Sequence, residues 1–108
     1  MRASLGVTGL VAALLWTEAT LADNGYEIVA QNDSAGPVTI TIDGKAGCSA
    51  DAGKSCTLRF SNTGATFAYS LAGAQPVAFV PGNPEVVEAC HFDAHGAHCL
   101  DTMGKPTN

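Results

Sequence analysis

Hydrophobic and polar residues alternate in short runs along most of the chain after residue 24. In residues 38–42, valine and isoleucine alternate with threonine, and every residue is β-branched. Residues 56–60 and 66–71 alternate in the same way, and we expect their aromatic side chains to face a core. Alternation with a period of two is typical of strands that bury one face.

Further runs of the same kind extend the set of expected strands. They are residues 26–30, residues 77–80, and a last hairpin made of residues 85–92 and 98–103. Pro76 and Pro81 enclose residues 77–80, which favours an edge strand because proline cannot donate to a sheet. The last hairpin alternates imperfectly, since Glu88 falls on the face of Cys90; a bulge or a later start of the strand would resolve this. The pattern predicts an all-β fold, a small antiparallel β-sandwich or open barrel of about six to seven short strands.

The segments between these runs are rich in turn-forming residues. Asp43 and Gly44 form a typical hairpin turn. We expect a small polar loop between Cys48 and Cys56, and a frayed end at residues 104–108. Residues 32–34, Asn-Asp-Ser, also belong to a turn and fit the acceptor pattern for N-glycosylation.

The N-terminal residues have the pattern of a secretory signal peptide. Arg2 precedes an apolar run, and small residues stand at Thr20 and Ala22. The run is too short to cross a bilayer, and no stop-transfer pattern follows it. We expect cleavage after Ala22, which leaves residues 23–108 as one secreted or periplasmic β domain without stable membrane insertion.

All four cysteines, Cys48, Cys56, Cys90 and Cys99, lie after the expected cleavage point. An even number of cysteines in a small secreted chain favours disulfides, which supplement a thin core. Three pairings are possible for two bridges. We favour Cys48–Cys56 and Cys90–Cys99, because each pair is close in sequence and is flanked by strand-like residues.

The stretch from Cys90 to Cys99 also holds all three histidines of the chain. If Cys90 lies opposite Cys99 in a hairpin, His91 lies opposite His98, and Gly96 suits the left-handed position of a short loop. Because side chains alternate between faces, both sulfurs point one way and both imidazoles the other. Asp93 shares the imidazole face.

This arrangement suggests a transition-metal site as one hypothesis. His91, His95 and His98, with Asp93 in support, would bind Zn²⁺, Cu²⁺ or Ni²⁺, for which imidazole is a suitable ligand. The competing interpretation is that the histidines lie on a solvent-exposed hairpin without binding metal, or that one of them packs under the sheet. No other metal, and no organic cofactor, is indicated by the sequence.

The composition narrows the possible partners. The formal net charge is −5, and the acidic residues are spread along the chain without a basic stripe. This argues against nucleic acid as a partner.

The serines lie in ordinary strand or turn contexts, and no cysteine pair has redox spacing, so we expect no catalysis.

Residues 36–45, Gly-Pro-Val-Thr-Ile-Thr-Ile-Asp-Gly-Lys, resemble the opening of PEGA-type modules, which are small extracytoplasmic β-sandwich repeats. The resemblance extends over residues 36–74. It differs at the cysteine pair, and Asn62–Ala65 stands where those modules usually have a Pro-Gly-x-His stretch. The resemblance implies a non-catalytic envelope module and transfers no functional residues.

Three functions follow as hypotheses. The first is a non-catalytic binding or structural module of the cell envelope, with an unknown protein partner. The second is a periplasmic metal-binding protein that uses the histidine hairpin. The third is a secreted inhibitor or effector that presents the loop between Cys48 and Cys56, for which the feature to check is whether Lys54 projects from the tip of the loop.

Overall fold

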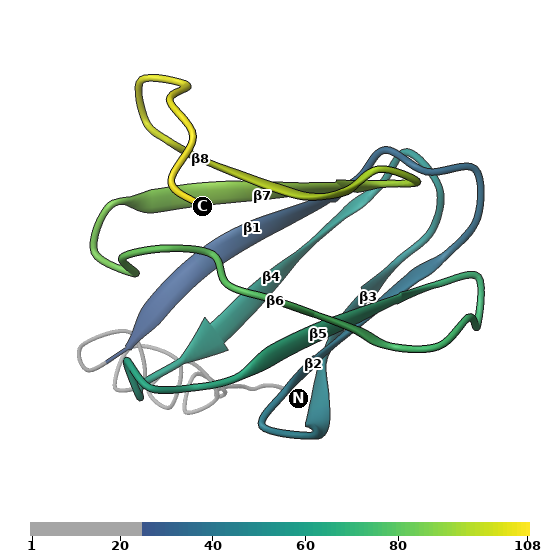
Figure 1. Ribbon diagram of the computed structural model, residues 1–108, viewed down its shortest axis with the longest axis horizontal. Helices are drawn as coiled ribbons and strands as arrows, with labels where there is room; N and C mark the ends of the chain where they lie inside the picture. The colour runs from purple at the N-terminus through teal and green to yellow at the C-terminus, as the bar shows by residue number, and fades with distance from the viewer. Residues whose placement is uncertain (1–24) are drawn as a thin grey trace, which may run out of the picture.

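The computed structural model describes residues 25–108, which form eight β-strands in two four-stranded sheets (Figure 1). Sheet A has the strand order β4-β1-β7-β8, and sheet B has the order β3-β2-β5-β6. The strands are β1 Tyr26–Asn32, β2 Val38–Ile42, β3 Lys45–Ala50, β4 Ser55–Phe60, β5 Phe67–Leu71, β6 Val77–Phe79, β7 Val87–Asp93 and β8 Gly96–Asp101. The all-β prediction is confirmed, with eight strands where six or seven were expected. The predicted signal peptide, residues 1–22, lies outside the described residues.

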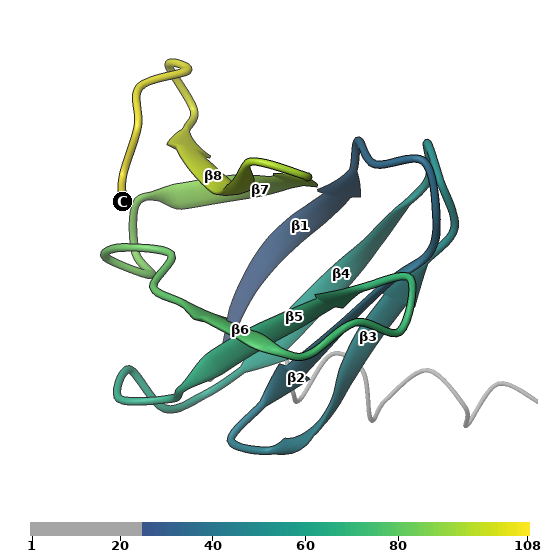
Figure 2. The ribbon, with the colours of Figure 1, turned by 45° about the vertical axis from the view of Figure 1, so that its right-hand side comes forward.

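The two sheets pack with their alternating apolar side chains between them. The β7–β8 hairpin lies on the opposite side of the molecule from the β2–β3 hairpin (Figures 1 and 2). Phe92 of sheet A contacts Tyr69 and Phe79 of sheet B, with ring centroids 5.2 and 5.1 Å apart. The fully buried side chains include Ile28, Val38, Ile40, Leu58, Cys90, Phe92 and Cys99. Within residues 25–108, no helix is long and apolar enough to cross a membrane.

Strand β3 replaces the first part of the loop that we expected between Cys48 and Cys56. Its glycine, alanine and serine residues have low strand propensity, so its sequence carries little signal. Hydrogen-bonded pairing with β2 holds β3 in place. The two strands are joined by a two-residue turn, in which Asp43 and Gly44 have φ angles of 54° and 79°. At the bulge in this pairing, a Cβ on Gly47 would lie 2.8 Å from the carbonyl oxygen of Ile40, so only glycine fits.

The irregular start of the last hairpin has two causes, both anticipated from the sequence. Strand β7 begins at Val87, and its register with β8 shifts between Val87 and Ala89. The bulge leaves Glu88 exposed and turns Val87 inward onto the face of Cys90. Strand β6 is an edge strand of sheet B, as its flanking prolines predicted.

Asn32, at the end of β1, is fully buried and lies where the chain crosses between the sheets. Its side-chain amide donates to the carbonyl oxygens of Gly36 and Ala50, at 2.8 and 2.9 Å. Its Oδ1 accepts from the backbone N–H and the hydroxyl of Ser34, at 2.9 and 2.6 Å. The sequence marked Asn32 as a glycosylation acceptor, but in this fold its amide is buried and fully hydrogen-bonded.

The prediction of a frayed end at residues 104–108 is wrong. Beyond β8 the chain turns and runs back along the outer edge of this strand, where Leu100 and Pro106 form a β-bridge. This segment has no periodic pattern of hydrophobic residues, because its hydrogen bonds come from backbone atoms and from single polar side chains.

Candidate functional site

The β7–β8 hairpin has the register that the cysteine spacing predicted. Cys90 lies opposite Cys99, and His91 lies opposite His98. Gly96 closes the two-residue connection with a φ of 133°, a value that L side chains rarely adopt. The Cys90–Cys99 disulfide is fully buried on the inner face, while both imidazoles lie on the outer face of sheet A.

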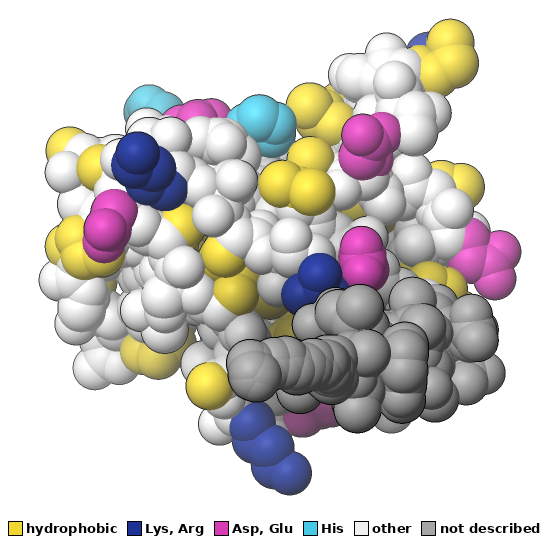
Figure 3. All heavy atoms as spheres, turned by 180° about the vertical axis from the view of Figure 1, so that it is seen from behind, with side chains coloured by type: hydrophobic (Ala, Val, Ile, Leu, Met, Phe, Trp, Pro, Cys, Tyr) yellow, Lys and Arg dark blue, Asp and Glu magenta, His cyan; other side chains and the backbone are white. Residues whose placement is uncertain are grey.

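Each of these two histidines is paired with a carboxylate. His91 Nδ1 lies 3.0 Å from Asp33 Oδ2, and His98 Nε2 lies 3.4 Å from Asp93 Oδ1. All four side chains are between 32% and 52% exposed, so solvent reaches both pairs. In Figure 3 the histidine side chains lie along the upper rim of the molecule, with acidic side-chain atoms between them.

Asp33 is the member of the site that the sequence analysis missed. It follows Asn32 in the β1–β2 connection, and its backbone N–H donates to the carbonyl oxygen of Phe92 at 2.8 Å. This bond holds Asp33 beside β7 and within reach of His91. The two residues are 58 positions apart, so only the parallel pairing of β1 with β7 brings them together.

Asp93 organises the tip of the hairpin. Its Oδ1 accepts the backbone N–H of His95 at 2.8 Å, and this bond is the main reason that the pKa of Asp93 lies below its usual 3.8. Partial desolvation opposes this effect, while the imidazole of His98 lowers the pKa further. Asp93 therefore remains a carboxylate in mildly acidic solution.

The predicted metal ligands are only partly brought together. His91, His98 and Asp93 share a face, whereas His95 contributes its backbone N–H to the tip of the hairpin. In the part of the chain that the structure describes, no three His, Cys, Asp or Glu side chains are close enough to hold a metal ion. The metal site stays a prediction, and the observed contacts are two separate histidine–carboxylate pairs.

The rest of this surface is mixed apolar and polar. Two cross-strand rows lie on the outside of sheet A: Thr57, Val29, Ala89 and Leu100 form one, and Ser55, Gln31, His91 and His98 form the other. Val29 is 40% exposed at the centre of the first row. We call the outer surface formed by Val29, Gln31, His91, His98 and Leu100 the histidine face.

The Cys48–Cys56 disulfide is present as predicted, but its place in the fold differs from the expected one. Cys48 lies in β3 and Cys56 in β4, so the bridge joins sheet B to sheet A. Only residues 51–54 lie outside the strands, so no long loop projects between the cysteines. Lys54 is exposed in this connection, while its carbonyl oxygen accepts the N–H of Asn32 at 2.9 Å.

Comparison of the chain with family models, curated proteins and solved structures finds no match. The resemblance of residues 36–74 to PEGA-type modules therefore stays a prediction from the sequence.

The account of Asp93 is tested by NMR titration of its carboxyl group in the intact chain and in His98→Ala. We expect a pKa below 3.8 in the intact chain. In His98→Ala the pKa should rise but stay below 3.8, because the stronger bond from the His95 N–H remains. Since the pKa is lowered by folding, the stability that Asp93 contributes is present above pH 3.8 and is lost as the pH falls through the folded-state value.

His91→Ala is the matched control, because His91 contacts Asp33 and leaves Asp93 untouched. A pKa of Asp93 at or above 3.8 in the intact chain, or an equal change in both variants, would contradict this account.

Proposed function

We propose that this protein is a non-catalytic binding module that acts outside the cytoplasm, in the periplasm or the surrounding medium, and that it contacts a protein partner through the histidine face. The observation that carries the proposal is the difference between the two outer surfaces of the sandwich. The outer surface of sheet A carries two histidine–carboxylate pairs and the exposed side chain of Val29, whereas the outward positions of sheet B carry small, uncharged side chains.

The histidine face combines the features of a polar, adaptable recognition surface. His91 and His98 offer ring nitrogens to solvent, each positioned by a carboxylate, and Val29 adds exposed apolar area beside them. Recognition surfaces commonly surround apolar contacts with polar groups that fix the orientation of the partner. Both histidine–carboxylate pairs lie on strands or are bonded to them, which keeps the surface rigid.

The outer surface of sheet B provides the contrast. Its outward positions carry small, uncharged side chains, namely Thr39, Thr41, Ala46, Ser49, Ala68, Ser70 and Ala78. Such a surface offers few groups for specific recognition. It therefore serves as an internal reference for any test of the histidine face.

Two observations support a role without catalysis. The polar side-chain partners of His91 and His98 are carboxylates rather than hydroxyl or thiol groups that a base would activate. All four cysteines are bound in disulfides, so none is a free nucleophile.

The two disulfides also support a location outside the cytoplasm, because disulfides are typical of proteins that fold in an oxidising compartment.

The proposal is tested by affinity capture from an extract of the cells that produce the protein, with the oxidised chain as bait. Recovery of the bound partner should fall at least about tenfold in His91→Ala/His98→Ala, which corresponds to about 1.4 kcal/mol of binding free energy. The matched control is Thr39→Ala/Ser70→Ala on the outer surface of sheet B, which should leave recovery unchanged. Equal losses in both double variants, or no partner above bait-free resin, would contradict the proposal.

A calorimetric titration with Zn²⁺, Cu²⁺ and Ni²⁺ separates this function from metal binding. We expect a Kd weaker than about 10 µM, about −7 kcal/mol, because two imidazoles already paired with carboxylates make an incomplete ligand set. Submicromolar one-to-one binding that His91→Ala/His98→Ala abolishes would instead favour the metal-binding function. His95→Ala shows whether the third histidine takes part.

A further inference from the structure

The outer edge of β8 is covered by the chain that follows it, residues 102–108, which we call the return segment. A strand at the edge of a sheet exposes unpaired N–H and C=O groups that can pair with another strand. In β8 these groups belong to Ala97, Cys99 and Asp101, whose backbone groups bond to the return segment. The backbone groups of the residues between them, His98 and Leu100, point toward β7, because alternate residues of an antiparallel strand bond to opposite sides.

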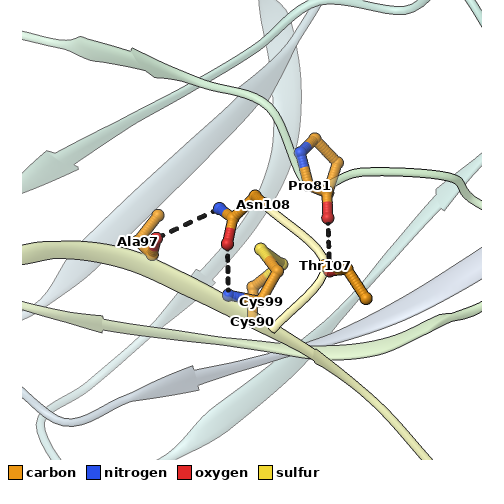
Figure 4. The surroundings of a disulfide bond; sticks show 6 residues. All are labelled: Pro81, Cys90, Ala97, Cys99, Thr107 and Asn108. Atoms are coloured by element: carbon orange, nitrogen blue, oxygen red, sulfur yellow. Dashed lines mark hydrogen bonds between the residues drawn. A yellow bond between two sulfur atoms is a disulfide. The ribbon is translucent and has the colours of Figure 1, made fainter. Parts of the chain in front are cut away.

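The return segment satisfies these groups in turn. The side-chain amide of Asn108 makes the two hydrogen bonds that the backbone of a neighbouring strand would make. Its Oδ1 accepts from Cys99 N at 3.1 Å, and its Nδ2 donates to Ala97 O at 3.2 Å (Figure 4). Thr107 N donates to Cys99 O at 2.8 Å. Lys105 O accepts from Asp101 N at 2.9 Å.

Contacts at both ends of the return segment hold it on the edge. At its start, Asp101 Oδ1 accepts the backbone N–H groups of Met103 and Lys105, which shapes the turn. Near its end, the hydroxyl of Thr107 donates to Pro81 O at 2.7 Å, which ties it to the connection after β6 (Figure 4). A Cβ on Gly82 would lie 2.3 Å from Thr107 O, so this close approach requires glycine.

We propose that the edge of β8 is a strand-docking site that the return segment keeps occupied, and that the uncovered edge pairs with β8 of a second copy of this chain. The groups on this edge are self-complementary about a two-fold axis at Cys99. Antiparallel pairing there lets Cys99 exchange both backbone hydrogen bonds with its copy. It also places Ala97 O opposite the Asp101 N–H of the other copy, and these are the groups that the return segment satisfies in the single chain.

Such pairing joins the two copies of sheet A into one continuous sheet. The acidic side chain of Asp101 then faces Ala97 of the other copy rather than a second Asp101, so like charges are not directly opposed. Both histidine faces lie on the same side of the joined sheet, since β8 contributes His98 and Leu100 to each. The inference stands independently of the proposed function, because it rests on the edge of the strand and not on that face.

The test is analytical ultracentrifugation of the full oxidised chain beside Gly82→Ala, which leaves every residue of the return segment in place but displaces it sterically. Gly73→Ala is the matched control: Gly73 also has a positive φ, near that of ordinary left-handed backbone, but its Cβ would meet nothing within 4 Å. We expect Gly82→Ala to dimerise with a Kd at least about tenfold lower than that of the full chain and of Gly73→Ala. Hydrogen exchange should show the Cys99 amide protected in the dimer.

Two further variants keep the test decisive if Gly82→Ala does not fold. One is a chain that ends after Gly104, and the other is Asn108→Ala, which removes only two hydrogen bonds. Variants that are folded but stay monomeric with an exchanging Cys99 amide would overturn the proposal. A full chain that dimerises as strongly as the variants would also overturn it, because the return segment would then not control the edge.

Discussion

The buried side chain of Asn32 is the interaction on which the rest of the structure depends. The chain crosses from sheet A to sheet B after β1 and crosses back between β3 and β4, and these are the first two of its four crossings. Asn32 contacts both crossings, since its amide binds Gly36 O in the first and Ala50 O beside the second. Its backbone adds bonds to Lys54 O and from Gly53 N. A buried amide is costly unless it is fully hydrogen-bonded, so these bonds specify one geometry for both crossings.

The geometry of the candidate site depends on the hydrogen bonds of Asn32. Because Asn32 fixes the start of the β1–β2 connection, the next residue, Asp33, is held beside β7 and faces His91. The Cys90–Cys99 disulfide fixes the register that places His91 opposite His98 on the same face. The Cys48–Cys56 disulfide joins the two sheets at β3 and β4, close to the crossings that Asn32 connects. The histidine face is therefore rigid although it lies at the surface.

The sequence predicted the features that depend on local pattern. The spacing of the cysteines and the position of Gly96 predicted the register of the last hairpin. The alternation of hydrophobic and polar residues predicted β2, β4 and β5. These patterns are informative because they reflect interactions between residues that are close in sequence. Strand β3 and the return segment were missed, since weak strand formers are held there by tertiary hydrogen bonds. Asp33 was missed for the same reason, as its partner is remote in sequence. The Asn-x-Ser spacing of residues 32–34 was an available signal for a side-chain–backbone turn, although it does not reveal burial.

The central role of Asn32 is tested most directly by urea unfolding of Asn32→Ala beside Asn62→Ala. Asn62 makes a similar side-chain bond, to the N–H of Gly64 at 2.8 Å, but in an exposed turn. Loss of the Asn32 amide leaves buried backbone groups unpaired, so the free energy of unfolding should fall by about 2–4 kcal/mol, against less than about 1 kcal/mol for Asn62→Ala. Equal, small losses in the two variants would contradict the account, because the crossings would then be held by other contacts.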